Sequence, residues 1–539
     1  MYKTNSTSQR VQIIQGTSYV YEDFPYWDAD KKQTRHKREY IGKLDGNGNF
    51  APNRAYATRL KLEEMEKRGN APKFDRPTSR NYFGATYLLD AIGEVTGVTA
   101  DLKAAFPADF QKIQSLAYYL ILETECPMYR FSKWAGNHYH PFGQDLPSQR
   151  ISELFESISE EAKMSFFKKQ TQRRAEKEYL AYDTTSISSY SELIAHVRYG
   201  KNKDGDSLPQ VNLALIFGQQ SMLPVYFRKL PGNITDVNTV RKLLKDLDYM
   251  SLSKVKLVMD RGFYSARNIN LLYRNHYKFL IGAKSNTNFA APLLDKARET
   301  IKDFTNYDSD QEVYRVGSME KWIYAEYDAK GNVVSKAERR IYVHIYYNGQ
   351  RAEDEKATFL KSLADAASNQ NEGACSDGQK ALCDKFLIRK STPVRGVKIE
   401  YNEEAIRTHV KNFGFFMLLS NEIKDPSEAL AVYRNKDLIE KSFGNLKNRL
   451  NMRRTMVTSS ENLEGKLFVQ FIALIYVSYI HKCMKDNQLY RNYTSQTMLD
   501  SLDIIERFDY PGQRQHFGEV TQKQEQLFER FGVKPPNML

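Results

Sequence analysis

The sequence has few cysteines and no long hydrophobic run, and both scarcities restrict what the protein can be. Its four cysteines include no close CxxC pair, which excludes a disulfide framework and a zinc knuckle. The first ten residues lack the apolar core of a signal peptide. The most apolar stretch, 468–480, is too short to cross a membrane and contains Gln470. A soluble intracellular protein with no membrane partner is therefore expected.

Basic residues outnumber acidic ones, which favours a polyanionic partner. The 539-residue chain has 79 Lys and Arg against 66 Asp and Glu, a formal net charge of +13 and a pI near 9.1. Such an excess suits binding to nucleic acid, although it also serves solubility. With 41% hydrophobic and 12% aromatic residues, the chain can bury a large core and is expected to divide into several domains.

The first segment, 1–80, is predicted to be a basic β-hairpin that binds DNA. TSYVYEDFPYW at 17–27 and TRHKREYIGKL at 34–44 are rich in β-formers, and a turn is expected between them at 28–31. The turn and the second strand carry a basic cluster: Lys31, Lys32, Arg35, His36, Lys37 and Arg38. This cluster fits a contact with phosphates, and it equally fits an ordinary solvated charged face.

Residues 81–177 show the apolar spacing of helices and are predicted to form a helical domain. ATYLLDAIGEV, FQKIQSLAYYLILE and SQRISELFESI each place apolar residues three and four apart. Within this region GNHYH places His138 and His140 two residues apart. That spacing suits metal ligation only on a strand, and no further ligand is near in sequence, so ordinary loop histidines are the simpler interpretation.

Beyond residue 177 the pattern changes to strands and helices. EYLAYDTT, VNLALIF and LPVYFRKL are predicted strands, DVNTVRKLLKDLDYM is a predicted helix, and VKLVMDRG is a fourth strand. A helix from about Ser265 and the strand YKFLIGAK follow. The first strand is expected to end at Asp183 and the fourth at Asp260. An aspartate at a strand end is commonly a turn former or a helix cap, so neither residue is informative alone.

Together, Asp183 and Asp260 predict a cation site. If the first and fourth strands are neighbours in one sheet, the two carboxylates face each other at the sheet edge where α/β proteins hold ligands. Two carboxylates so close repel each other unless a cation lies between them. Ligands that are all oxygen suit Mg²⁺ or Mn²⁺.

Three further regions follow in the chain. Residues 285–409 mix β-like pieces with a helix and a charged loop, and are predicted to form an inserted domain. GFFMLLS then returns as a strand, and Asp425, Pro426 and Glu428 have the pattern of a helix start. Residues 461–539 are predicted to be mainly helical.

The stretch YRNKDLIEKSFGNLK, 433–447, contains an acid beside a core stripe. On a single helix at ~100° per residue, one stripe is apolar: Val432, Ile439, Phe443, Leu446 and Leu450. A second stripe, centred ~70° away, carries Tyr433, Lys436, Glu440 and Lys447. Polar groups beside a core line a cleft, but Lys436 and Glu440 are four residues apart and also fit a helical ion pair. A break at Asn435 would move Tyr433 off this face.

These residues resemble a known family, the DDE transposases of bacterial insertion sequences, specifically the insertion-sequence-four type. The resemblance covers about 178–454 and rests on Asp183 with Thr184, on the segments LPQVNLALIFGQQSMLPVYFRKLPGN and VMDRGFYSARNINLL, and on a Tyr-Arg-Glu-Lys helix signature at Tyr433, Lys436, Glu440 and Lys447. Lysine at 436 stands where arginine is usual, which weakens a bidentate contact with phosphate. YWDADKKQTRHKREYIGKLD is similar to the opening segment of that group.

The resemblance implies an α/β ribonuclease-H-like catalytic core, a mixed sheet with flanking helices. The core would comprise 178–284 and 410–460, interrupted by a β-rich insertion domain at 285–409, between a helical N-terminal region and a helical C-terminal region. Asp183, Asp260 and Glu440 would be catalytic and would hold two Mg²⁺ ions, replaceable by Mn²⁺, for phosphoryl transfer. Water would first free a 3′-hydroxyl at the element end, and that hydroxyl would then attack DNA.

The resemblance also implies DNA contacts. Tyr433, Lys436 and Lys447 would contact phosphates near the cut, and Arg261 is a further candidate. In relatives that cut through a hairpin, an aromatic residue of the insertion stacks on a flipped base. Trp322 in EKWIYAEY is the candidate for that role, although packing in the core of the insertion is the simpler interpretation.

The expected function is therefore that of a transposase that binds the terminal inverted repeats of its insertion sequence and cuts and pastes DNA. Its expected partners are double-stranded DNA of the element ends and of the target, and a second copy of the chain in a synaptic complex. The expected location is the bacterial cytoplasm, on the nucleoid when bound to DNA. Two alternatives remain open: a two-metal structure-specific nuclease on the same fold, and a catalytically inactive DNA-binding protein.

Overall fold

The computed structural model forms two compact units. The first is Met1–Thr78 with Asp509–Arg514, and the second is Ser79–Phe508 with Gln515–Leu539, in each case for the residues that the structure describes. The described residues are 8–28, 33–67, 79–124, 126–174, 177–191, 194–200, 202–203, 205, 207–252, 254–327, 332–371, 375–392, 396–450, 454–455, 457, 459–510 and 515–536.

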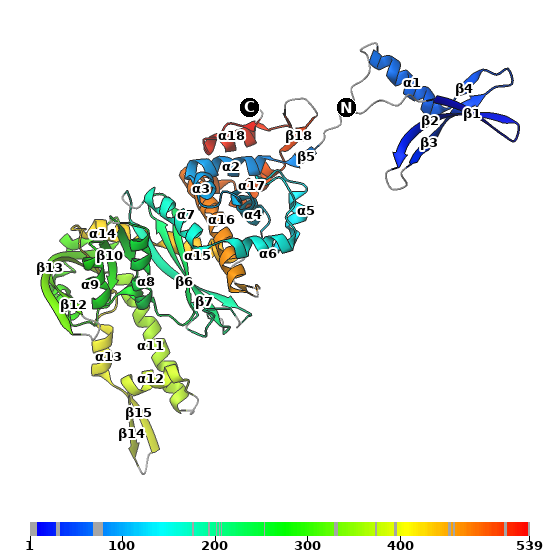
Figure 1. The fold of residues 1–539 in the computed structure, drawn as a ribbon. Helices are drawn as coiled ribbons and strands as arrows, with labels where there is room; N and C mark the ends of the chain where they lie inside the picture. Colours follow the sequence, from blue (N-terminus) through cyan, green and yellow to red (C-terminus); the bar gives the residue numbers. More distant parts are fainter. Residues whose placement is uncertain are drawn as a thin grey trace. The chain divides into compact units, whose positions relative to one another are not determined.

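The first unit is an antiparallel sheet with the strand order β1-β2-β3-β4, followed by the helix α1 (Figure 1). The predicted hairpin is present as β2 and β3, with Val20 and Ile41 buried. Lys31, Lys32 and most of the predicted turn lie outside the described residues. The elements are β1 (Ser8–Ile14), β2 (Thr17–Asp28), β3 (Gln33–Leu44), β4 (Phe50–Pro52) and α1 (Arg54–Lys67).

The helical part of the second unit is built from both ends of its sequence. The three helices predicted within 81–177 are present as α2, α4 and α6, and each packs against the long helix α16. The elements are β5 (Ser79–Tyr82), α2 (Gly84–Thr96), α3 (Val98–Ala105), α4 (Phe110–Leu122), η1 (Met128–Arg130), α5 (Phe131–Ala135), α6 (Ser148–Ser157), α7 (Glu160–Gln172), α16 (Ser460–Asp486), η5 (Leu489–Arg491), α17 (Ser495–Asp503), β18 (Glu506–Asp509), β19 (His516–Phe517) and α18 (Gln522–Arg530).

The helix α16 is longer than its apolar sequence run predicts. By length and composition alone it could cross a membrane, and it is the one such helix among the described residues. However, 78% of its most apolar window is buried inside the protein, where it contacts both the helices and strand β8. A helix that is apolar on all sides is expected in such a position in a core.

A ten-stranded sheet forms the centre of the second unit. Its order is β11-β12-β13-β16-β10-β9-β6-β7-β8, and β17 pairs with β6 off this path. β6, β7 and β8 are antiparallel neighbours, whereas β9 runs parallel to β6, and β10 parallel to β9. The first predicted strand therefore lies beside the fourth, in a mixed sheet consistent with a ribonuclease-H-like core.

The sheet and the helices beside it contain the following elements: β6 (Leu180–Ser189), β7 (Gln210–Gly218), β8 (Leu223–Pro231), α8 (Asp236–Tyr249), β9 (Lys256–Met259), η2 (Arg261–Phe263), α9 (Ala266–Arg274), β10 (Lys278–Ala283), α10 (Ala290–Thr300), η3 (Phe304–Asn306), β11 (Tyr307–Asp308), β12 (Val313–Tyr327), β13 (Val333–Tyr347), β16 (Phe415–Ser420), α14 (Pro426–Arg434), α15 (Asp437–Gly444), the π-helix η4 (Asn445–Arg449) and β17 (Arg454–Thr455).

Two sequence-based boundaries differ from the structure. β6 does not end at Asp183 but continues to Ser189, because the residues after Asp183 keep their pairing with β7. The β-like pieces predicted within 313–347 do not form a separate sheet. Their long hairpin, β12 and β13, pairs through β13 with β16 and so extends the core sheet.

A smaller cluster of apolar side chains supports the rest of that inserted stretch. Phe359, Leu363, Cys383 and Phe386 are buried together, apart from the main core. The elements around them are α11 (Gly349–Asn371), α12 (Asp377–Phe386), β14 (Leu387–Thr392), β15 (Gly396–Tyr401) and α13 (Glu403–Val410).

Candidate active site

Asp183 and Asp260 lie side by side on neighbouring parallel strands. Tyr182 of β6 is paired with Met259 of β9, and each aspartate is the next residue along its chain. Asp260 directly follows the end of β9 and precedes the short helix η2, one residue beyond the strand end. The pairing register therefore brings the two carboxylates to one place on the sheet.

Asp183 is fixed by its own backbone and by a lysine. Its Oδ1 accepts a hydrogen bond from the Thr184 amide at 2.7 Å and lies 3.7 Å from the Lys203 ammonium nitrogen. Burial raises the pKa of Asp183 above its ordinary value, and the ammonium of Lys203 and the Thr184 amide offset part of that rise. The carboxylate is thus partly withdrawn from water but has a cation beside it.

Asp260 is held in its ionised form by groups from α14 and from the turn after it. Burial alone would raise its pKa, but the Tyr433 hydroxyl, at 2.5 Å from Oδ1, and the Lys436 ammonium, at 3.7 Å, outweigh burial and lower it. Burial also raises the pKa of Tyr433, so its hydroxyl stays protonated and donates a hydrogen bond to Asp260.

Close packing against a glycine positions Tyr433. A Cβ atom at Gly282 of β10 would lie 2.9 Å from the Tyr433 hydroxyl oxygen and 2.9 Å from the Arg261 amide nitrogen. Real side chains essentially never come so close, so only glycine lets the tyrosine reach Asp260 at this point.

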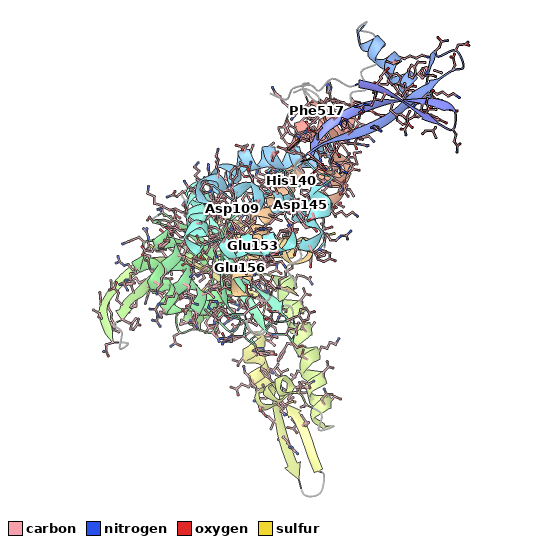
Figure 2. All side chains as sticks on the ribbon, turned by 45° about the vertical axis from the view of Figure 1, so that its right-hand side comes forward. Asp109, His140, Asp145, Glu153, Glu156 and Phe517 are labelled. Carbon is pink, nitrogen blue, oxygen red and sulfur yellow. The ribbon has the colours of Figure 1, made fainter. Side chains whose placement is uncertain are left out.

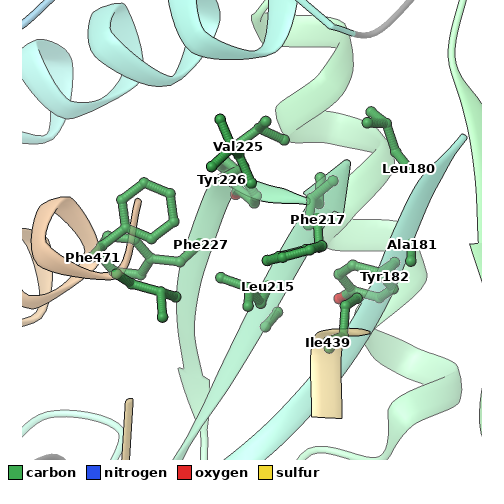
Figure 3. Close-up of a cluster of buried hydrophobic side chains, with 14 of the residues drawn as sticks. Leu180, Ala181, Tyr182, Leu215, Phe217, Val225, Tyr226, Phe227, Ile439 and Phe471 are labelled. Atoms are coloured by element: carbon green, nitrogen blue, oxygen red, sulfur yellow. The ribbon is translucent and has the colours of Figure 1, made fainter. Parts of the chain in front are cut away.

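Glu440 comes from α15, which is anchored on the sheet by its apolar face. Ile439 and Phe443 are buried, and Figure 3 shows Ile439 beside Tyr182 and Leu215 of the sheet. The Glu440 side chain itself is 63% exposed, with its Oε1 3.7 Å from the Lys436 ammonium. The ion pair between Lys436 and Glu440 that the sequence allows is therefore present. The same ammonium also lies 3.7 Å from Asp260, so it connects the two carboxylates.

The segment around Glu440 is not one continuous helix. α14 ends at Arg434 and α15 begins at Asp437, so the possible break at Asn435 is present. Even so, Tyr433 reaches Asp260 from the end of α14. The predicted start of α14 is also present, since Asp425 caps it by accepting the Glu428 amide at 2.8 Å, with Pro426 in the first turn.

The site also contains two polar residues that were not predicted from the sequence, Asp236 and Lys203. The Thr184 hydroxyl donates to Asp236 at 2.6 Å, and the Lys203 ammonium donates to the carbonyl and hydroxyl oxygens of Thr184 at 2.7 and 2.8 Å. Lys203 also lies 3.6 Å from Asp236. The one sequence signal was the position of Asp236 at the start of a helix after two strands, where an acid usually serves the helix dipole.

These groups share a single cleft of about 530 Å³. It is lined by Asp183, Thr184, Thr185, Lys203, Asp236, Asp260, Phe263, Glu440, Phe443, Gly444, Lys447 and Asn448. All the candidate metal donors in it are carboxylate oxygens, which fit Mg²⁺ or Mn²⁺ by their chemistry. In the described part of the chain, no group of three His, Cys, Asp or Glu side chains is already arranged to hold a metal ion. In the cleft, Lys203 lies beside Asp183 and Lys436 beside Asp260.

The remaining candidates lie in different surroundings. Lys447 lines the cleft, and Arg261 is exposed directly after Asp260. Trp322, by contrast, is only 5% exposed; its indole N–H donates to Asn270 at 2.8 Å and its ring meets Phe289 edge-on. Stacking on a flipped base would require Trp322 to leave this packing.

The histidine pair of the helical region is structural. Its two members are buried, His138 between Trp134 and Asp503 and His140 against Ser115; Figure 2 labels His140 among the helices. Burial lowers the pKa of His140 to about 4, which keeps it neutral. No metal cluster includes either residue in the part of the chain that the structure describes.

Comparison with known proteins identifies the family of this site. Residues 174–476, which carry all three acids, match the family model described as the transposase DDE domain. The chain belongs to the DDE transposases. It is therefore a DNA transposase enzyme, of a family that uses divalent metal ions and acts on DNA.

A solved structure is also similar to the transposase, although distantly. It is the piggyBac transposase synaptic complex with hairpin DNA, with 12% sequence identity, a TM-score of 0.33, and coverage of 77% of this chain and 70% of that one. Comparison with curated proteins finds no match.

Proposed function

We propose that this transposase binds the terminal inverted repeats of an insertion sequence of the insertion-sequence-four type and catalyses metal-dependent cleavage and strand transfer. The observation that carries the proposal is the single cleft shared by Asp183, Asp260 and Glu440. The protein would act as a dimer in a synaptic complex, in the bacterial cytoplasm.

The charged side chains in and beside the cleft, and Tyr433, have proposed tasks. Asp183, Asp260 and Glu440 hold two Mg²⁺ ions, which when bound activate the attacking oxygen and stabilise the leaving one. Tyr433 orients Asp260 through its hydrogen bond. Lys436 and Lys447 contact the phosphates of the DNA that is cut, with Arg261 beside them.

Lys203 and Asp236 support the first aspartate. Together they hold Thr184, the residue next to Asp183, through its hydroxyl and its carbonyl. Fixing the neighbour fixes the direction of the Asp183 side chain. The lysine also offsets the repulsion among the carboxylates before DNA and metal bind.

An assay on labelled DNA that carries an element end next to flanking sequence tests the proposal. With Mg²⁺ or Mn²⁺ we expect nicks at the element boundary and products joined to a target, and with EDTA we expect binding without cleavage. Nicks without joined products would indicate the structure-specific nuclease. Binding without any cleavage would indicate an inactive DNA-binding protein.

A further inference from the structure

A second cleft of the same unit, outside the carboxylate site, is lined by basic side chains. It has a volume of about 740 Å³, the larger of the two. Arg241 and Lys245 enter it from α8, and Arg267 and Arg274 enter it from α9. These two helices contact each other, and Figure 1 shows them on the same part of the unit. We call this cleft the basic groove.

The spacing of the four residues aligns them along the groove. Arg241 and Lys245 are four residues apart, and Arg267 and Arg274 are seven apart, so each pair stands on one face of its helix. The opposite faces of α8 and α9 are buried in the core. Both helices are therefore anchored on the core, which fixes the points at which the four basic side chains leave the backbone.

The charge of the groove is not balanced from within. Among the described residues none of the four basic side chains has an ion-pair partner. The groove contains two acids, Asp248 and Glu326, and Glu326 already accepts a hydrogen bond from the Tyr324 hydroxyl. A concave site with a surplus of fixed positive charge attracts a polyanion with regularly spaced charges.

The groove and the carboxylate cleft are neighbours along one helix. Asp236, the first residue of α8, lines the cleft, and Arg241 in the groove follows five residues later. At 1.5 Å per residue this is ~7.5 Å along the helix axis, about the rise of two base pairs. Around the helix axis the two residues lie ~140° apart, so the groove is a surface separate from the cleft.

We infer that the basic groove binds the phosphate backbone of duplex DNA outside the catalytic cleft and independently of base sequence. The inference rests on the proposed function, because this duplex is the DNA on which the transposase acts. The phosphate backbone could belong to either of two duplexes, the element DNA or the target DNA. All four basic side chains would pair with phosphate oxygens, and none of them acts on the phosphodiester bond that is cut.

The test compares two double variants of the full chain that lose the same charge. One is Arg241→Gln with Lys245→Gln in the groove. The control is Lys356→Gln with Lys361→Gln, two exposed lysines of α11. Affinity is measured by fluorescence anisotropy over a range of salt concentrations, on one duplex of unrelated sequence and one that ends in the terminal repeat.

For the groove variant we expect weaker binding, and a plot of log association constant against log salt that is shallower by about two, the number of phosphate contacts removed. At about 0.1 M salt this corresponds to a loss of up to about eightfold for each contact. The control should bind as the unchanged protein does. Thermal melting of both variants confirms that they are folded.

The outcomes separate the sources and the two proposals. A loss on both duplexes bears out the inference and extends it to target DNA. A loss only on the repeat-ended duplex would assign the groove to element DNA and would overturn its independence of base sequence. A groove variant that binds like the control overturns the inference, even if the unchanged protein cleaves at the element boundary. If the unchanged protein does not cleave but the groove variant still loses affinity, the proposed function fails and the groove remains.

Discussion

At the scale of single residues, the cleft depends on neighbours that direct its acids. Tyr433 and Lys436 hold Asp260, while Thr184 and Lys203 hold Asp183. These contacts give each carboxylate one orientation before DNA or metal arrives. Preorganisation of this kind is what positions reacting groups efficiently.

Replacing Gly282 with alanine should slow cleavage with little loss of folded protein. The new methyl group would press on the Tyr433 hydroxyl and the Arg261 amide and displace the tyrosine from Asp260. We expect the rate of boundary nicking to fall by about tenfold to a hundredfold. Gly349→Ala is the control, because open space surrounds that position. Equal rates for the two variants would contradict the role of Tyr433.

Lys203→Met should change how the protein responds to divalent ions. Without metal we expect a loss of about 1 kcal/mol or less, because the lysine is partly exposed and its contribution is screened. Adding Mn²⁺ should raise the melting temperature more in this variant than in the unchanged protein, since no ammonium competes beside Asp183 and Asp236. Lys242→Met, at an exposed position of α8, is the control. An identical Mn²⁺ shift in all three proteins would show that Lys203 does not share the metal site.

The residues of the cleft differ in how visible they are in the sequence. Asp183, Asp260 and Glu440 could be predicted because each aspartate follows an apolar run and the glutamate belongs to a helical signature, and the structure brings them to one cleft. Asp236 and Lys203 could not. An acid in the first turn of a helix looks like an ordinary partner of the helix dipole, and Lys203 joins the site through a loop contact with no periodicity.

At the scale of elements, a cluster of ion pairs connects helix α16 to helix α7 and to strand β8. Glu464 of α16 accepts from Lys163 of α7 at 2.9 Å and lies 3.1 Å from Lys229 of β8. Both lysines are buried. Burial alone would raise the pKa of Glu464, but the two ammonium groups outweigh it and lower the pKa below the ordinary value.

Glu464→Gln should destabilise the fold at neutral pH but not in acid. We expect a loss of roughly 3 kcal/mol at pH 7, because buried Lys229 loses its carboxylate partner and Lys163 keeps only Glu160. A carboxyl with a lowered pKa stabilises the fold above its ordinary value near pH 4.5 and loses that effect as pH falls through the folded value. Urea unfolding at several pH values should therefore show the difference shrinking in acid. Glu461→Gln, exposed on the same helix, should change stability little, and a pH-independent difference for Glu464→Gln would contradict the account.

Most elements of the core could be predicted from their patterns, but their ends could not. Apolar runs identified β6, β9 and β10 correctly. The end of β6 was placed too early because a strand with residues buried on both faces continues through polar Thr and Ser when its neighbour keeps pairing. The hairpin of β12 and β13 extends the core sheet because β13 pairs with the edge of β16 that β10 leaves open. This pairing joins segments far apart in the sequence, so local patterns do not predict it.

At the scale of the whole molecule, the first unit has a surface suited to DNA. Arg35 and Lys37 of β3 alternate with His36 and Arg38, which face the buried carboxylate of Asp23. The members of the first pair share the opposite face of the strand. Both are exposed, and Arg35 also lies 3.4 Å from Asp28 in a surface ion pair, whereas the second pair serves the fold.

Arg35→Gln with Lys37→Gln should weaken DNA binding while the melting temperature stays unchanged. The expected change is again a salt dependence shallower by about two, measured by fluorescence anisotropy on the repeat-ended duplex. The charge-matched α11 variant is the control. If the two variants bind alike, the basic run of β3 is only a solvated face.

The central claim is that Glu440 completes a catalytic set with Asp183 and Asp260. The most direct measurement is the rate of nicking at the element boundary in Mg²⁺ by the unchanged protein and by Glu440→Gln, with DNA affinity and unfolding measured on the same samples. The account predicts a loss on the order of a thousandfold in rate, with affinity and stability retained. A rate within a few-fold of the unchanged protein, or a loss that follows the loss of folded protein, would contradict it and leave Glu440 as the ion-pair partner of Lys436.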